Sequence, residues 1–181
     1  MHAKNLIIVF ILVLFVNSAS AQRPSLSTMP ADEKFTSAKG AFTVGLPKDG
    51  VETLVNKTNE RGVKVVWNLA EGVVTVQFGE YLDDSSLKSD QDLTYFLNAM
   101  KNEIMKVEGS KLVSETPLKV GAFRGMIYET IHDGQKSQLR VIALDKKYYF
   151  MYAVVLSDVA GADKLISKAL DTFSLSAPAL K

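Results

Sequence analysis

The chain has 181 residues, with 21 Lys and Arg against 20 Asp and Glu, and it contains no cysteine. A formal net charge of +1 gives no attraction to nucleic acid or to anionic lipid, so we expect neither as a partner. Without cysteine the chain has no disulfides, thiol catalysis, thiolate metal sites or lipid-modified cysteine.

The first 21 residues are typical of a secretory signal peptide. Lys4 precedes an unbroken apolar run from Leu6 to Val16, and Ala19-Ser20-Ala21 has small residues at the A-x-A positions of a cleavage site. Eleven apolar residues at about 1.5 Å each do not cross roughly 30 Å of hydrocarbon, which disfavours a membrane anchor. We therefore predict cleavage before Gln22, no membrane span, and a soluble periplasmic or extracellular product.

The rest of the chain is the size of one ordinary domain. Residues 22–34 hold two prolines and no hydrophobic period, which predicts a flexible lead. We predict a single domain over 35–176 and a short tail at 177–181.

The first half of this domain has the pattern of two hairpins. Phe35 to Leu46 turns around Lys39-Gly40, and Val63 to Tyr81 turns around Glu71-Gly72, with apolar residues alternating on both sides of each turn. Between them, residues 48–62 are polar and predict only a weak strand or turn at 51–55.

Two amphipathic helices are predicted. The first runs from about Asp90 to Glu108, with Ser89 as its N-cap and Gly109 at its C-terminal end. The second lies between Gly161 and a Ser174-Leu175-Ser176 tail. A strand from Lys111 to Leu118 follows the first helix.

The stretch from Val120 to Leu156 predicts an antiparallel meander of three strands, with turns at Asp133-Gly134 and at residues 145–147. Its last strand, Tyr148 to Leu156, is apolar on both alternating faces, which favours burial between two layers. We therefore predict an α+β domain in which an antiparallel sheet carries one helix on each face, an α/β/α sandwich.

Four local phrases and the order of elements resemble the Mog1/PsbP-like superfamily and small exported bacterial relatives, including DcrB-like proteins. These phrases are Gly40 to Pro47, Lys119 to Gly125, Lys147 to Met151 and Asp171 to Leu175. The resemblance implies a binding or assembly module without known catalytic residues, since family members serve as a partner of a small GTPase or as an extrinsic photosystem subunit.

Candidate chemistry is sparse. His132 is the single histidine after the signal peptide, and a triad around it would need a hydroxyl and a carboxylate brought together by the fold. Glu129 lies in an otherwise apolar strand and is either buried or solvent-facing. The acidic loop with Glu80, Asp83 and Asp84 is either a cation site or a solvated loop. We expect no cofactor, no metal and no catalytic residue.

Aromatic residues of the meander are the remaining candidates. Tyr128 and Tyr149, with His132 at the turn, are predicted binding residues, and the competing interpretation is that the tyrosines fill the core. The leading hypothesis is a monomeric, non-catalytic exported module that binds a protein partner. The alternative is a carrier or sensor of a small apolar ligand, and an enzyme comes third.

Overall fold

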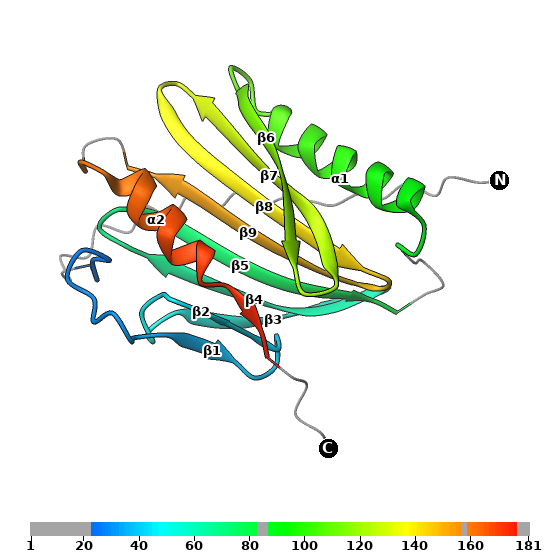
Figure 1. Ribbon diagram of the computed structural model, residues 1–181, viewed down its shortest axis with the longest axis horizontal. Helices are drawn as coiled ribbons and strands as arrows, with labels where there is room; N and C mark the ends of the chain where they lie inside the picture. Colours follow the sequence, from blue (N-terminus) through cyan, green and yellow to red (C-terminus); the bar gives the residue numbers. More distant parts are fainter. Residues whose placement is uncertain (1–22, 83–86, 157–158, 177–181) are drawn as a thin grey trace.

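The computed structural model describes residues 23–82, 87–156 and 159–176 (Figure 1). The predicted signal peptide, the tail at 177–181, and Asp83 and Asp84 of the acidic loop lie outside these residues. Within them, no helix has the length and apolar character needed to cross a membrane.

A seven-stranded antiparallel sheet forms the centre of the domain, in the order β3-β4-β5-β9-β8-β7-β6 (Figure 1). It joins two meanders, because β9 pairs with β5 on one side and with β8 on the other. The strands are β3 Val51–Lys57, β4 Glu60–Asn68, β5 Gly72–Tyr81, β6 Lys111–Val120, β7 Phe123–His132, β8 Gln135–Leu144 and β9 Lys147–Val155.

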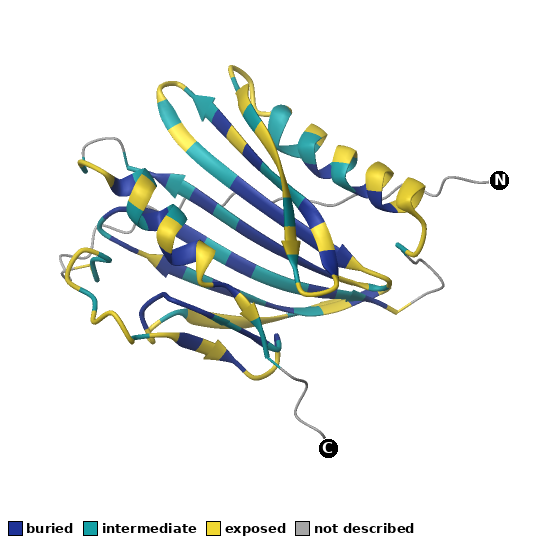
Figure 2. Ribbon diagram, in the orientation of Figure 1, coloured by how far each residue is buried: buried dark blue, intermediate teal, exposed yellow. Residues whose placement is uncertain are grey.

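The last strand of the meander is buried on both faces, as predicted from its alternation. Tyr148 and Phe150 pack with the residues beneath helix α1 (Asp90–Met105). Tyr149 and Met151 pack with those beneath α2 (Ala162–Asp171). Both helices turn buried residues inward and exposed residues outward (Figure 2). The predicted α/β/α sandwich is confirmed.

Helix α1 begins where the sequence predicts. The Ser89 hydroxyl accepts a hydrogen bond from the Asp92 amide (3.0 Å), and the Asp92 carboxylate accepts one from the Ser89 amide (3.2 Å). The helix ends at Met105 and not at Glu108, because the Lys106 amide closes a tighter turn on the Glu103 carbonyl.

Strand β3 is longer than the weak strand predicted at 51–55. All seven of its residues pair with β4, from Val51 opposite Val66 to Lys57 opposite Glu60. Its side chains are almost all exposed, so no alternation in the sequence marks it. Strand β6 forms the opposite edge and extends the meander to four strands; Pro117 is accommodated there because an edge strand has one unpaired side.

A second, three-stranded sheet has the order β1-β2-β10, with β1 at Phe35–Ser37, β2 at Phe42–Val44 and β10 at Ser174–Leu175. The first two strands are the predicted hairpin. The third strand was not predicted, because Ser174 and Leu175, expected as a tail after the second helix, pair with β2. This sheet and α2 cover the same face of the large sheet.

The segment that precedes β1 is attached to the turn between β4 and β5. Glu71 is 1% exposed, and its carboxylate accepts hydrogen bonds from the Ser25 hydroxyl (2.6 Å) and from the amides of Leu26 (3.1 Å) and Ser27 (3.3 Å). Burial raises the pKa of Glu71, but the hydrogen bonds together lower it by a larger amount. The pKa of this carboxyl group is therefore below its usual value.

Candidate functional site

A groove of ≈ 350 Å³ lies between α2 and the strands β7 and β8. It exists because α2 packs on β9 and β5, which leaves the same face of β7 and β8 uncovered beside it. Its size is at the lower end of the range for ligand-binding pockets, about 300–1,000 Å³. The lining residues are Val113, Glu129, Thr130, Ile131, Lys136, Ser137, Gln138, Val155, Asp163, Lys164, Ile166 and Ser167.

The polar floor of the groove is set by strand register. Ser114, Glu129 and Gln138 lie opposite one another on β6, β7 and β8. The Ser114 hydroxyl donates to one oxygen of the Glu129 carboxylate (2.7 Å), and the Gln138 amide nitrogen donates to the other (3.3 Å). Glu129 is therefore held in place by two neutral donors. Of the two positions considered for it, buried or solvent-facing, the structure shows the solvent-facing one.

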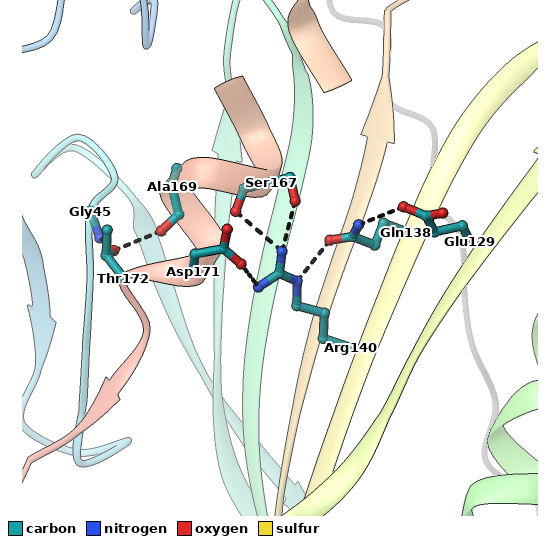
Figure 3. A network of polar contacts seen from close by, with 8 residues as sticks. All are labelled: Gly45, Glu129, Gln138, Arg140, Ser167, Ala169, Asp171 and Thr172. Atoms are coloured by element: carbon teal, nitrogen blue, oxygen red, sulfur yellow. Dashed lines mark hydrogen bonds and ion pairs between the residues drawn. The ribbon is translucent and has the colours of Figure 1, made fainter. Parts of the chain in front are cut away.

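Arg140 connects this floor to α2 (Figure 3). It is 3% exposed, and its Nε donates to the Gln138 side-chain oxygen (2.7 Å). Its Nη1 donates to Asp171 (2.7 Å), and its Nη2 donates to the hydroxyl (2.9 Å) and the carbonyl (3.1 Å) of Ser167. Because the Gln138 oxygen faces Arg140, its nitrogen must face Glu129. A buried cation thus fixes the orientation of the groove's carboxylate.

An ion pair crosses the other end of the groove. The Lys136 ammonium on β8 lies 2.6 Å from the Asp163 carboxylate on α2. The hydrogen bond from Lys136, and a second one from the Lys164 amide, lower the pKa of Asp163, while the same pair raises the pKa of Lys136. Both side chains are solvent-exposed, so salt screens this pair.

The walls between these polar groups are aliphatic. Ile131 lies two residues from Glu129 on the same face of β7, and Val155 and Ile166 come from β9 and α2. Val113, at the irregular pairing in β6, is 57% exposed at the rim. The groove therefore combines apolar walls with one carboxylate on its floor.

The two predicted binding tyrosines lie on opposite faces of the sheet. Tyr128 is 2% exposed beneath α1, and its hydroxyl donates to the Leu97 carbonyl (3.0 Å). Tyr149 is 3% exposed beneath the small sheet, and its hydroxyl donates to the Gly40 carbonyl (3.1 Å). Burial raises the pKa of each phenol to about 12. The fold does not bring these residues together, and neither lines the groove.

His132 lies at the end of β7, on the same face as Tyr128 and four residues further along the strand. Its Nε2 is 3.4 Å from the Asp133 carboxylate. Its Nδ1 is buried and has no hydrogen-bond partner within the described part of the chain. The predicted tight turn follows, with Asp133 and Gly134 both at positive φ (48° and 77°).

Acidic clusters in the described ranges do not form a metal site, since no group of three or more His, Asp or Glu there could hold an ion. Glu80, predicted as part of the acidic loop, lies instead in strand β5 opposite Arg61 of β4, which binds its carboxylate at 2.8 Å.

The polar network at the groove was not predicted from the sequence: Gln138 and Ser167 line the groove, and Arg140 and Asp171 lie beside it. A signal was present, because Gln138 and Arg140 occupy the phase of β8 that also carries buried Ile142. Polar side chains in the inward phase of a strand indicate a hydrogen-bonded network.

The fold is that of the PsbP-like proteins, an antiparallel sheet between helical layers. The chain is similar to the solution structure of cyanobacterial PsbP (CyanoP) from Synechocystis sp. PCC 6803, with 12% identity and a TM-score of 0.54, over 79% of this chain and 91% of that one. It also matches LpqN of Mycobacterium tuberculosis, described as involved in cell envelope biogenesis, with 12% identity and a TM-score of 0.44, over 74% and 87% of the two chains. No protein-family model and no curated protein matches the sequence. The predicted Mog1/PsbP-like resemblance is confirmed for the fold.

Proposed function

We propose that the protein is an exported, non-catalytic binding module that acts through a protein partner, and that the groove between α2 and β7–β8 receives that partner. The observation that carries this proposal is the groove itself, with apolar walls and a hydrogen-bonded polar floor on rigid elements. Sites built on strands and helices hold their geometry better than sites on loops. The predicted secretory signal supports export.

A small apolar ligand is the second candidate, favoured by the aliphatic side chains of Ile131, Val155 and Ile166. A lipid tail on this floor would remove water from the Glu129 carboxylate without replacing its hydrogen bonds, which is costly. A peptide segment supplies both apolar side chains and polar groups. The protein partner is therefore the first choice.

Affinity capture from the native compartment tests the proposal, with two variants of the mature chain as bait. Val113→Glu adds a charge at the exposed rim of the groove, where little folding energy is at stake. Leu144→Glu is the matched control, since Leu144 is 42% exposed on β8, about 20 Å along the strand from Gln138.

We expect the wild type and Leu144→Glu to capture one stoichiometric protein that Val113→Glu loses. Equal capture by all three baits would place the partner elsewhere and refute the groove. A lipid that co-purifies with the wild type in native mass spectrometry, in place of a protein, would favour the second candidate.

A further inference from the structure

We infer that the groove selects a basic side chain, with Glu129 as the residue that determines this specificity. The occupant is an extended segment of the partner that inserts one Lys or Arg side chain between aliphatic neighbours. This inference rests on the proposed function and gives the chemistry of the partner.

The first argument is the unused hydrogen-bonding capacity of Glu129. A carboxylate has about four lone-pair positions. Within the described residues, one neutral donor, from Ser114 or Gln138, is found at each oxygen. Each oxygen therefore keeps capacity for a donor from the groove side, and both oxygens are already oriented.

The second argument is the balance of charge around the groove. Arg140 is paired with Asp171 at 2.7 Å, and Lys136 is paired with Asp163 at 2.6 Å. Lys164 also acts on Asp163, since its charge and its amide both lower the pKa of that carboxyl. The lining cations are thus hydrogen-bonded to Asp163 and the buried cation to Asp171, while the charge of Lys136 also acts on Glu129 without a hydrogen bond between them.

Glu129 differs from these acids, because the hydrogen-bond donors that hold it are neutral. A ligand ammonium or guanidinium group would supply a positively charged hydrogen-bond donor, since the charge of Lys136 acts on Glu129 only at longer range. Charge-assisted hydrogen bonds are roughly twice as strong as neutral ones. An anionic head group, by contrast, would meet this carboxylate and be repelled.

The third argument is the shape of the walls. Lys and Arg side chains carry a long aliphatic stem behind a charged head. Ile131 is partly exposed beside the floor and offers apolar surface to such a stem, while the head reaches Glu129; Ile166 also lines the groove but is 2% exposed. Val113 at the exposed rim offers contact to an apolar neighbour in the partner segment.

The test is an NMR titration of the isotope-labelled mature protein with three acetylated, amidated tripeptides. Each peptide has valine at both ends and lysine, norleucine or glutamate in the centre. Norleucine keeps the stem of lysine and removes its charge. The side-chain amide signal of Gln138 reports directly on the groove, because its nitrogen donates to Glu129.

We expect saturable shifts at Gln138 and Ile131 with the lysine peptide, weaker shifts with norleucine and none with glutamate. Glu129→Gln should weaken the lysine peptide about tenfold, as the loss of a hydrogen bond to a charged group implies, and high salt should act in the same direction. Glu115→Gln is the matched control, since Glu115 lies on the opposite face, paired with Lys101, and should leave the affinity unchanged.

Equal affinity for the lysine and norleucine peptides would overturn the inference, as would a Glu129→Gln variant that binds like the wild type. Shifts confined to another surface would do the same. The two proposals fail separately. If Glu129→Gln still captures the partner that Val113→Glu loses, the groove binds a protein but not through a cation. If the lysine peptide binds and no partner is captured, the proposed function fails.

Discussion

Replacing Arg140 tests whether its hydrogen bonds hold α2 against β8. The side chain is 3% exposed and donates to Gln138, Asp171 and Ser167. In Arg140→Met the aliphatic stem keeps its packing, but the acceptors on Gln138 and Ser167 lose their donor. In Arg140→Lys the positive charge stays buried, and one ammonium group replaces a fork that reaches three residues.

The magnitude follows from opposing terms. Hydrogen bonds to charged groups contribute about 1.5–3 kcal/mol, and removing a buried cation also removes its desolvation cost of several kcal/mol. Asp171 is 66% exposed, so water solvates its carboxylate once Arg140 is gone. We expect Arg140→Met to lower the free energy of unfolding by about 2 kcal/mol and Arg140→Lys by about 3 kcal/mol.

Urea unfolding followed by tryptophan fluorescence measures both values. Trp67 is the single tryptophan, is 2% exposed, and donates from its indole nitrogen to the Pro47 carbonyl (2.7 Å). For a domain of this size, 1 kcal/mol corresponds to about 3 °C in Tm. If Arg140→Lys is more stable than Arg140→Met, the buried positive charge alone stabilises the domain. The argument that the guanidinium group is needed for its hydrogen bonds to three residues would then be wrong.

Three further changes address other parts of the fold. The pKa of Glu71 is lower in the folded than in the unfolded protein, so its stabilising effect is present above the unfolded pKa and is lost as the pH falls through the folded pKa. In a series of urea unfolding experiments at different pH, Glu71→Gln should therefore reduce the fall in the free energy of unfolding at acid pH. Tyr149→Asp should unfold the domain, because it would bury an unpaired carboxylate. Tyr149→Phe should lower the free energy of unfolding by about 1 kcal/mol, because only the hydrogen bond to the Gly40 carbonyl is lost. An unchanged Tm for Tyr149→Asp would refute the two-sided burial of β9. Gly79→Ala should cost about 2 kcal/mol in thermal unfolding, since its methyl group would overlap the Tyr148 ring, and a wild-type Tm would mean that the ring moves freely.

The sheet and its helices could be predicted because their signals are local. Strand β9 carries apolar residues in both phases, and α1 carries its capping box at Ser89. Strand β3 lacks such a signal, since both of its faces are exposed and only its pairing with β4 defines it. Strand β10 is two residues long, so its existence depends on β2, far away in the sequence.

The groove could be predicted only in part, for a related reason. Glu129 stands out in its strand, but its partners Ser114 and Gln138 are identified by register, which the sequence does not specify. The tyrosines illustrate the opposite problem. An aromatic strand is equally compatible with a binding surface and with a core, and only the packed layers show that Tyr128 and Tyr149 are buried.

The pairing of β10 with β2 has a consequence for the order of folding. The Ser176 amide donates to the Ala41 carbonyl (2.9 Å), and the rings of Phe42 and Phe173 stack at 5.6 Å. These contacts close nearly the whole domain into one loop, with an entropic cost that grows slowly with the length of the loop. The other rings on Phe42, those of Phe35 and Tyr149, come earlier in the chain, whereas Phe173 and the third strand of the small sheet come from its last described residues. The small sheet therefore needs both ends of the domain, and it cannot be completed before the C-terminal residues of β10 are present.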